Sequence, residues 1–316
     1  MLEADKQVLA WLLEGDPAVR WQTQRDLLDK SPAVYEAERA KVAEEGWGAR
    51  LLSLQDPQGT WAGGLYTPKW TSTHYTLLTL AFLGLPAANA QAQKACQILL
   101  EDGFLPDHGI RYNLKKPDKH GHAETCITGM ALGLFSAFEL DDARVDQIAS
   151  HLLAQQMADG GWNCRSYRGD THSSFHTTLL VLEGLRRYWQ AKPAAPQTIT
   201  AAMAAGRQFL LEHSLFRSHR SGTIVKAAFL RTPAQPSWQY DILRALDHFQ
   251  ATGAARDERL AEAIGLLQKS QSGDGRWDEQ TPASGKLWFR METPGKPGRW
   301  NTLRALRVLK WWQASR

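Results

Sequence analysis

The chain has 316 residues, of which 43% are hydrophobic and 22% charged, and its formal net charge is +4. This composition is that of a globular protein, and so small a charge over this length does not indicate a nucleic-acid-binding protein. No apolar stretch is long enough to span a bilayer, no secretory signal pattern is visible, and three cysteines are too few for a disulfide scaffold, so we expect a cytoplasmic location.

The first predicted helices form a lead-in over residues 1–45. One of them covers residues 4–13. The next begins after Asp16, because aspartate is a favoured N-cap and Pro17 suits the first helical position. We therefore expect a short helical segment before the main domain.

A motif with the spacing Gln-x3-Gly-x-Trp follows a leucine-rich helical segment at three places in the chain. The copies are Gln55-x3-Gly59-x-Trp61, Gln156-x3-Gly160-x-Trp162 and Gln271-x3-Gly275-x-Trp277. They lie about 100 residues apart with weaker echoes between them, which indicates a structural repeat of about 50 residues. The tryptophan content, 13 residues against 7 tyrosines, agrees with a repeated use of indoles.

Each copy of the motif has the features of a helix end. The glutamine lies in the last turn, where its amide can reach unpaired carbonyls, and the glycine allows a left-handed stop. The tryptophan then folds back as an apolar plug with one N–H to place. We predict that Trp61, Trp162 and Trp277 are buried.

A more apolar helix follows each polar loop. These second helices begin at equivalent positions in the repeat, namely Thr73, Thr125, Phe175, Gln239 and Arg299. Strand-like alternation is almost absent from the sequence. The predicted fold is therefore all-α, with five helical hairpins that form one continuous domain over residues 46–316 and bury the second helix of each hairpin.

The repeated motif in helical hairpins resembles that of squalene–hopene and oxidosqualene cyclases, whose α/α toroid is shared by the β subunits of protein prenyltransferases. The resemblance implies a central apolar cavity that binds an isoprenoid near the N-terminal ends of the inner helices. The D-x-D-D acid motif of class II cyclases is missing, and the nearest string, Glu139-Leu-Asp141-Asp142, falls at the far end of an inner helix. The chain is therefore not expected to be a standard class II cyclase.

One segment is similar to the diphosphate and zinc region of prenyltransferase β subunits. Gly160-Gly-Trp162 is followed by two arginines at the spacing of that family's diphosphate ligands, and histidines and acidic residues occur near its other functional positions. The resemblance implies ligand-binding roles for Arg165, Arg168, His120 and His122, and catalytic roles for Asp170, His172, Tyr240 and Asp241. The family's zinc histidine is absent from the helix that begins near Gln239, which departs from the family pattern.

Cysteines and histidines gather near the same repeat junction. Aligned inner helices place Cys126 and His176 at equivalent positions, Cys164 leads into the second of these helices, and His172 lies one helical turn before His176. Such a set of two thiolates and two imidazoles suits Zn²⁺. The alternative is a core cysteine, a hydrogen-bonded histidine and a reduced loop thiol, without metal.

Three tryptophans, Trp70, Trp238 and Trp300, lie just before or at the starts of inner helices. In a toroid, this position is the rim of the cavity, where aromatic faces can hold an apolar chain or a carbocation. Packing at the rim is the alternative role.

Two kinds of function agree with these patterns. The first is an isoprenoid-processing transferase or cyclase that binds a prenyl diphosphate, with or without zinc. The second is a non-catalytic toroid that binds a lipid, a peptide or a partner protein, with zinc in a structural role. A partner subunit remains open in both.

Overall fold

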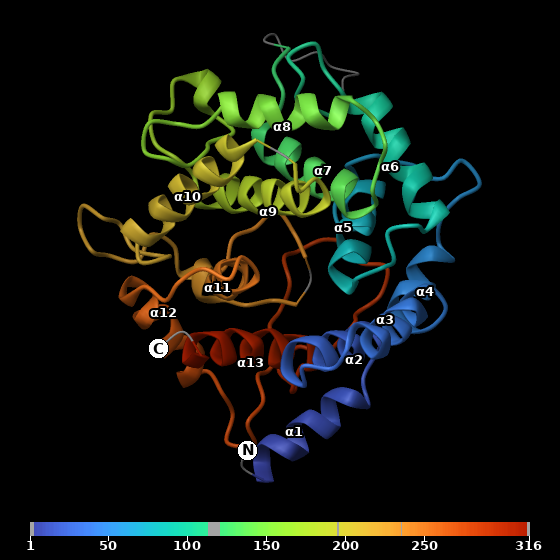
Figure 1. Cartoon of the computed structure of the whole chain (residues 1–316), viewed down its shortest axis with the longest axis vertical. Coiled ribbons are helices and arrows are strands. Elements are labelled where there is room, and N and C mark those ends of the chain that lie inside the picture. Colours follow the sequence, from blue (N-terminus) through green and yellow to red (C-terminus); the bar gives the residue numbers. More distant parts are fainter. Residues whose placement is uncertain (1–2, 113–120, 195, 235, 315–316) are drawn as a thin grey trace.

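The computed structural model describes residues 3–112, 121–194, 196–234 and 236–314 (Figure 1). Over these residues the fold is all-α, and the only β pairing is in isolated bridges. The elements in chain order are α1 (Glu3–Leu13), α2 (Pro17–Gln22), η1 (Thr23–Leu27), α3 (Pro32–Ala40), η2 (Lys41–Ala43), α4 (Gly46–Leu52), α5 (Thr73–Leu83), α6 (Ala90–Gly103), α7 (Thr125–Ala137), α8 (Arg144–Ala154), η3 (Ser166–Arg168), α9 (Phe175–Ala191), α10 (Gln197–Glu212), η4 (Ala227–Leu230), α11 (Ile242–Ala251), η5 (Glu258–Leu260), α12 (Ala261–Lys269) and α13 (Arg299–Ala314).

The inner helices form a ring. α5 contacts α7, α7 contacts α9, α9 contacts α11, and α11 contacts α13. Figure 1 shows α6, α8, α10 and α12 around the outside of these helices. The predicted all-α toroid of helical hairpins is therefore confirmed.

Four of the five inner helices begin at the residue that the sequence predicts, and α11 begins later. Its predicted start was Gln239, but the first helical residue is Ile242. The reason is Asp241, which has extended backbone and caps the helix by accepting a hydrogen bond from the Arg244 amide.

The N-terminal lead-in closes the ring between its last and first inner helices. α13 contacts α1, α2 and η1. The Trp21 indole donates to the Leu83 carbonyl at the end of α5 at 2.9 Å. Asp16 caps α2 as predicted, by accepting from the Ala18 amide. The lead-in thus acts as a further inner element of the toroid.

The three motif copies make the same hydrogen bonds. The indoles of Trp61, Trp162 and Trp277 donate to the carbonyl of a leucine near the end of the preceding outer helix, at 2.8, 2.7 and 2.8 Å. In each copy the glutamine amide donates to the carbonyl of the motif glycine, at 2.9, 2.7 and 3.0 Å. All three glycines have left-handed φ, and all three tryptophans are buried. The predicted buried plugs and left-handed glycines are confirmed. The glutamines, predicted in the last turn of each outer helix, instead lie beyond the helices, which end at Leu52, Ala154 and Lys269, so each amide closes the motif loop and does not cap the carbonyls of its own helix.

Each plug is also joined to the following inner helix. The backbone N–H groups of the three motif tryptophans donate to the hydroxyls of Thr73, Thr178 and Thr302, at 3.0 Å in each case. The α6–α7 unit has no such tryptophan, yet the Ile110 amide makes the equivalent bond to the Thr128 hydroxyl at 2.9 Å. One threonine therefore fixes the loop to the inner helix in four units.

α7 and α9 approach each other more closely than side chains would allow. A Cβ at Gly184 would lie 2.2 Å from the Gly129 carbonyl oxygen, and one at Gly129 would lie 2.8 Å from the Val181 Cα. Glycine is required at this crossing because any side chain would push the helices apart. Among the described helices, none combines the length and apolar character needed to cross a membrane.

Candidate functional site in the central cavity

A cavity of about 610 Å³ lies inside the ring. It is formed at the C-terminal ends of α5 and α7, the second halves of α9 and α11, and parts of η1 and α13. The sequence placed the ligand near the N-terminal ends of the inner helices, so this cavity lies at the opposite end of the ring from the predicted position.

The lining of this cavity is polar and rich in arginine. Its charged residues are Arg25, Arg39, Arg186, Arg187, Arg244, Arg307, Asp26, Glu139, Glu183 and Asp247. The apolar lining that the resemblance implied is therefore not found in this cavity. The hydrophobic side chains of the inner helices pack between helices, while charged side chains face the cavity. Its main apolar walls are the rings of Trp21, Phe82 and Trp300.

Four of the six cavity arginines pair with carboxylates. Arg244 makes a two-point ion pair with Glu183, at 2.7 and 2.6 Å. Arg307 pairs with both Asp247 and Asp26. Arg25 pairs with Asp26, and Arg39 with Glu36. These pairs join α9 to α11, and α11 to α13 and η1, so they form a rigid charged frame around the cavity.

Arg186 and Arg187 have no carboxylate partner among the described residues. The Arg186 guanidinium donates to the Gln190 side chain at 2.9 Å, but its Nε is buried with no partner in the described chain. Arg187 donates to the Ala81 carbonyl at 3.5 Å and lies over the Phe82 ring. Burial lowers the pKa of Arg187 to about 10, so it stays charged at neutral pH. These adjacent cations are available to an anion.

His248 adds an uncharged polar group to the same wall. It is 3% exposed, lines the cavity, and neither ring nitrogen has a partner in the described part of the chain. Burial, followed by the charges of Arg186 and Arg207, holds the pKa of His248 well below its ordinary value. The imidazole is therefore neutral, with one nitrogen able to donate and the other to accept.

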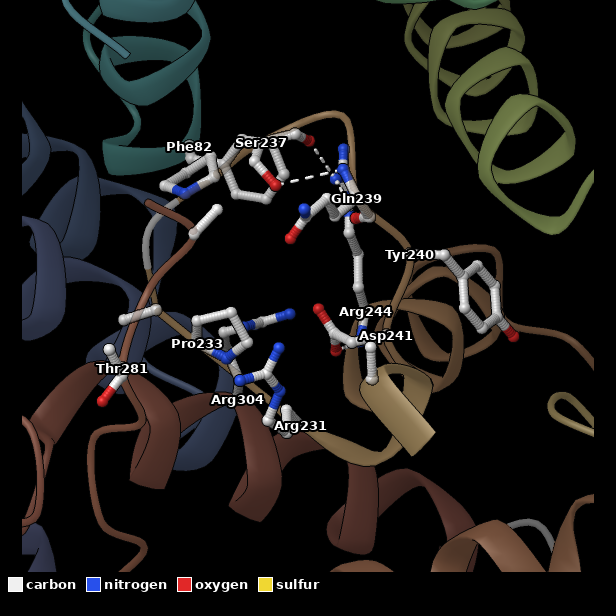
Figure 2. Close-up of a pocket in the computed structure, with 14 residues that line it drawn as sticks. Phe82, Arg231, Pro233, Ser237, Gln239, Tyr240, Asp241, Arg244, Thr281 and Arg304 are labelled. Carbon is white, nitrogen blue, oxygen red and sulfur yellow. Dashed lines mark hydrogen bonds between the residues drawn. The ribbon is translucent and has the colours of Figure 1, made fainter. Parts of the chain in front are cut away.

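A smaller pocket of about 30 Å³ adjoins the cavity at the N-terminal end of α11. Figure 2 shows Asp241, Arg304 and Arg231 directed into this pocket. Phe82 and Arg244 line both spaces, and the Arg244 guanidinium lies 5.4 Å from the centre of the Phe82 ring. Phe82 and Arg244 thus separate the interior of the ring into the large cavity and the smaller pocket.

Asp241 is the buried acid of the smaller pocket. One carboxylate oxygen accepts from the Arg244 amide at 2.8 Å. Burial raises the pKa of Asp241, against the opposing effect of the Arg304 charge. Arg304 is 3% exposed, and its Nε is buried without a hydrogen bond among the described residues. The pocket therefore combines a carboxyl that holds its proton more tightly than usual with buried cationic surface.

Tyr240, predicted beside Asp241, does not offer its hydroxyl to this pocket. It is 3% exposed, and its hydroxyl donates to the Leu215 carbonyl at 2.7 Å. Its ring packs against Phe175 and Phe229. The Tyr240 side chain therefore has a packing role in the structure, because the bond to the Leu215 carbonyl uses its only hydroxyl proton.

Of the other predicted ligand and catalytic residues, Arg165, Arg168, Asp170 and His172 lie on the loop before α9, and His122 lies in the segment before α7. Arg165 pairs with Asp170 at 3.4 Å, and Arg168 donates to the Tyr167 hydroxyl. His122 packs against the Tyr167 ring, and His172 contacts Arg220 at 3.1 Å. His120 lies outside the described residues. These side chains are not among those that line the cavity.

The four predicted zinc ligands do not converge. Cys126 and Cys164 meet, since the Cys126 amide donates to the Cys164 sulfur at 2.9 Å. The His176 Nδ1 instead accepts from the Tyr240 amide at 2.8 Å, and His172 is exposed beside Arg220. No group of three possible metal ligands occurs within the described ranges. Two thiols alone fall short of a zinc ligand set, so zinc stays a prediction and no step below depends on it.

The three predicted rim tryptophans have different positions. Trp70 is buried and donates to the Ser284 carbonyl at 2.8 Å, which ties the turn before α5 to the segment before α13. Trp238 packs against the His176 ring, with Lys69 over its face. Trp300 lines the central cavity. Of the three, Trp300 is therefore the one placed to contact a ligand in that cavity.

The sequence patterns above did not predict Arg186, Arg187 and His248, or the ion pairs that frame the cavity. A signal for them exists. The inner helices are otherwise apolar where they pack, and Glu183, Arg186 and Arg187 interrupt α9 at spacings of three and four, while Arg244, Asp247 and His248 do the same in α11. Charged residues at helical spacing on a buried helix indicate a polar interior face.

Two buried carboxylates hold the segment before α13. Glu279 accepts from the Ala234 amide and the Asn301 side chain, each at 3.2 Å. Glu292 accepts from the Arg299 amide at the start of α13. Burial raises the pKa of each to about 7. Both carboxyl groups therefore bind protons more tightly in the folded chain than in the unfolded chain.

These carboxyl groups predict a pH dependence of stability. Because their folded pKa values lie above the unfolded ones, their contribution is largest at low pH and is lost as the pH rises from about 4.5 to about 7, by up to about 3 kcal/mol per group. Glu279→Gln should therefore flatten the fall in unfolding free energy over this range, measured by urea denaturation at a series of pH values. Parallel curves for the variant and the original chain would contradict the assignment.

No protein-family model and no curated protein matches this sequence. Solved structures of the type II terpene cyclase MstE from Scytonema superpose on it. The superposition on the apo form has a TM-score of 0.35 and 16% sequence identity. It covers 86% of this chain and 97% of the cyclase chain. A variant in complex with geranylgeranyl dihydroxybenzoate has a TM-score of 0.36 and 17% identity, with 88% and 97% coverage. These superpositions are too loose to place any residue.

Proposed function

We propose that this chain binds an isoprenoid diphosphate in the central cavity, with the diphosphate on Arg186 and Arg187. The observation that carries the proposal is the presence of two adjacent, partly buried arginines on a cavity wall without a carboxylate partner in the described chain. Buried cations without partners are costly, and an anionic ligand would relieve that cost. Guanidinium groups also match phosphate oxygens in two-point geometry.

The size and walls of the cavity support this ligand class. A volume of about 610 Å³ is within the usual range of small-molecule sites. The rings of Trp21, Phe82 and Trp300 provide apolar and aromatic surface for a hydrocarbon chain on the same walls. A small recess of about 20 Å³ beside Arg187 and Glu183 adds apolar contacts from Leu78, Met130, Leu134 and Leu180. A ligand with an anionic head and an apolar chain suits both kinds of surface.

Asp241 is our candidate for acid chemistry on such a ligand. Its carboxyl group faces the smaller pocket, across Phe82 and Arg244 from the proposed diphosphate position. A buried acid with a raised pKa can donate a proton. The arginines would stabilise negative charge on a departing diphosphate. Turnover of a prenyl diphosphate that Asp241→Asn abolishes without weakening binding would support the enzyme, and binding without turnover would favour the non-catalytic toroid.

Ligand titration tests the diphosphate position. The double variant Arg186→Gln, Arg187→Gln should weaken binding of a prenyl diphosphate at least about 100-fold, because each of the two lost charged hydrogen bonds contributes roughly 1.5–3 kcal/mol. It should hardly change binding of the matching prenyl alcohol. Isothermal titration calorimetry with both ligands measures this difference.

The exposed loop offers a matched control. Arg165→Gln, Arg168→Gln removes the same charge from the residues that the sequence singled out, outside the cavity lining. We expect its affinity for the prenyl diphosphate to stay within about twofold of the original. The reverse pattern, with loss in the loop variant and none in the cavity variant, would move the diphosphate to the loop and refute the proposal.

A further inference from the structure

Cys126 and Cys164 meet at the junction of two hairpins, away from the residues that line the cavity. Cys126 is the second residue of α7, and Cys164 lies in the loop between Trp162 and α9. The Cys164 sulfur accepts from the Cys126 amide at 2.9 Å and from the Thr177 hydroxyl at 3.5 Å. Two donors, one of them the amide of Cys126 itself, therefore point at the Cys164 sulfur.

This arrangement assigns different roles to the two thiols. Hydrogen bonds to the Cys164 sulfur, together with the N-terminus of α7, stabilise its thiolate form. Cys126 is the neighbouring thiol within reach of the same sulfur. Both side chains are partly exposed, whereas Cys96 is fully buried and has only a distant carbonyl, that of Leu134, at 3.9 Å. Cys96 therefore provides an internal comparison.

We propose that Cys126 and Cys164 are a redox-active dithiol that hydrogen peroxide converts to an intrachain disulfide. The Cys164 sulfur attacks a peroxide oxygen: an S–O bond forms, the O–O bond breaks, and hydroxide leaves and takes up the thiol proton as water. The Cys126 sulfur then attacks the Cys164 sulfur: the S–S bond forms, the S–O bond breaks, and a second water leaves with the Cys126 proton. Two thiols are oxidised by two electrons, and the peroxide is reduced to water.

The disulfide would connect the start of α7 to the loop that holds η3. That loop carries Arg165 and Arg168, which therefore become fixed to the neighbouring hairpin on oxidation. The cross-link closes a long segment of chain, so the oxidised form is expected to be more stable than the reduced form. This inference is independent of the proposed ligand, because it uses neither the cavity nor its arginines.

Mass spectrometry and thiol titration test the proposal on the full chain. After mild hydrogen peroxide treatment, the intact mass should fall by two hydrogen atoms and the titratable thiols from three to one. Peptide mapping should join the Cys126 and Cys164 peptides, and dithiothreitol should restore the thiols. The melting temperature should be higher in the oxidised form. Three unchanged thiols, or a disulfide that includes Cys96, would overturn it.

Single-cysteine variants separate the two roles. In Cys126→Ser, the reaction should stop at a sulfenic acid on Cys164, which dimedone captures, while Cys96→Ala should react like the original chain. Circular dichroism checks that each variant is folded. If a variant does not fold, the peptide map of the peroxide-treated original chain tests the proposal without it. Zinc in the purified protein that protects both thiols until a chelator removes it would also refute a free dithiol.

Discussion

Replacement of Trp162 by alanine should lower the free energy of unfolding by about 3–5 kcal/mol. Trp162 is completely buried, and its indole N–H donates to the Leu152 carbonyl at 2.7 Å. The backbone amide of Trp162 also donates a hydrogen bond to the Thr178 hydroxyl on α9. The substitution thus leaves a large cavity and removes the shorter of two hydrogen bonds to the Leu152 carbonyl, which keeps only the Gln155 amide at 3.3 Å. Urea denaturation monitored by circular dichroism measures the loss.

Two further variants separate the parts of this effect. Trp162→Phe keeps most of the ring volume and loses the indole hydrogen bond, while the Leu152 carbonyl keeps the Gln155 amide at 3.3 Å, so we expect a loss of about 0.5–1.5 kcal/mol. Trp189→Ala removes a tryptophan that is 41% exposed on α9, and its effect should stay within about 0.5 kcal/mol. If Trp162→Ala were no worse than Trp189→Ala, the plug would not have the structural role assigned to the motif.

Asp247→Asn should lower the unfolding free energy by a similar amount, about 3–5 kcal/mol. Asp247 pairs with Arg307 and, at 3.7 Å, with Arg304, and the side chains of both arginines are no more than 11% exposed. These charges lower the pKa of Asp247 despite its burial. Loss of the carboxylate would leave two buried cations between α11 and α13 with weakened compensation.

Glu262→Gln provides the matched control for this ion pair. Glu262 makes a two-point pair with Arg217, at 2.7 and 2.5 Å, but both side chains are at least 33% exposed. Exposed pairs contribute about 0–1 kcal/mol, so we expect a small effect. Equal losses for Asp247→Asn and Glu262→Gln would show that burial does not determine the strength of these pairs.

The fold was predictable because its signals are local. The Gln-x3-Gly-x-Trp copies mark outer-helix ends through bonds within one turn and loop, and capping residues mark where inner helices begin. α11 was the exception, since alignment of the repeats put its start at Gln239, although Asp241 is the favoured N-cap residue two positions later. The role of α2 and η1 in closing the ring depends on the contact with α13, which lies at the other end of the sequence.

The site was less predictable because it depends on how the ring is formed. Equivalent positions on successive inner helices face the next helix in turn. Cys126 therefore meets Cys164 of the following unit, while His176 meets Tyr240 of the unit after that. Alignment of the repeats puts Cys126 and His176 at the same level, but the rotation between units directs them to different partners.

A crystal structure of the chain with a non-hydrolysable prenyl thiodiphosphate would test the central proposal most directly. We expect the thiodiphosphate within hydrogen-bonding distance of Arg186 and Arg187, and the prenyl chain against Trp21, Phe82 and Trp300. Thiodiphosphate density beside Arg165 and Arg168, or a cavity that stays free of ligand at saturating concentration, would contradict it.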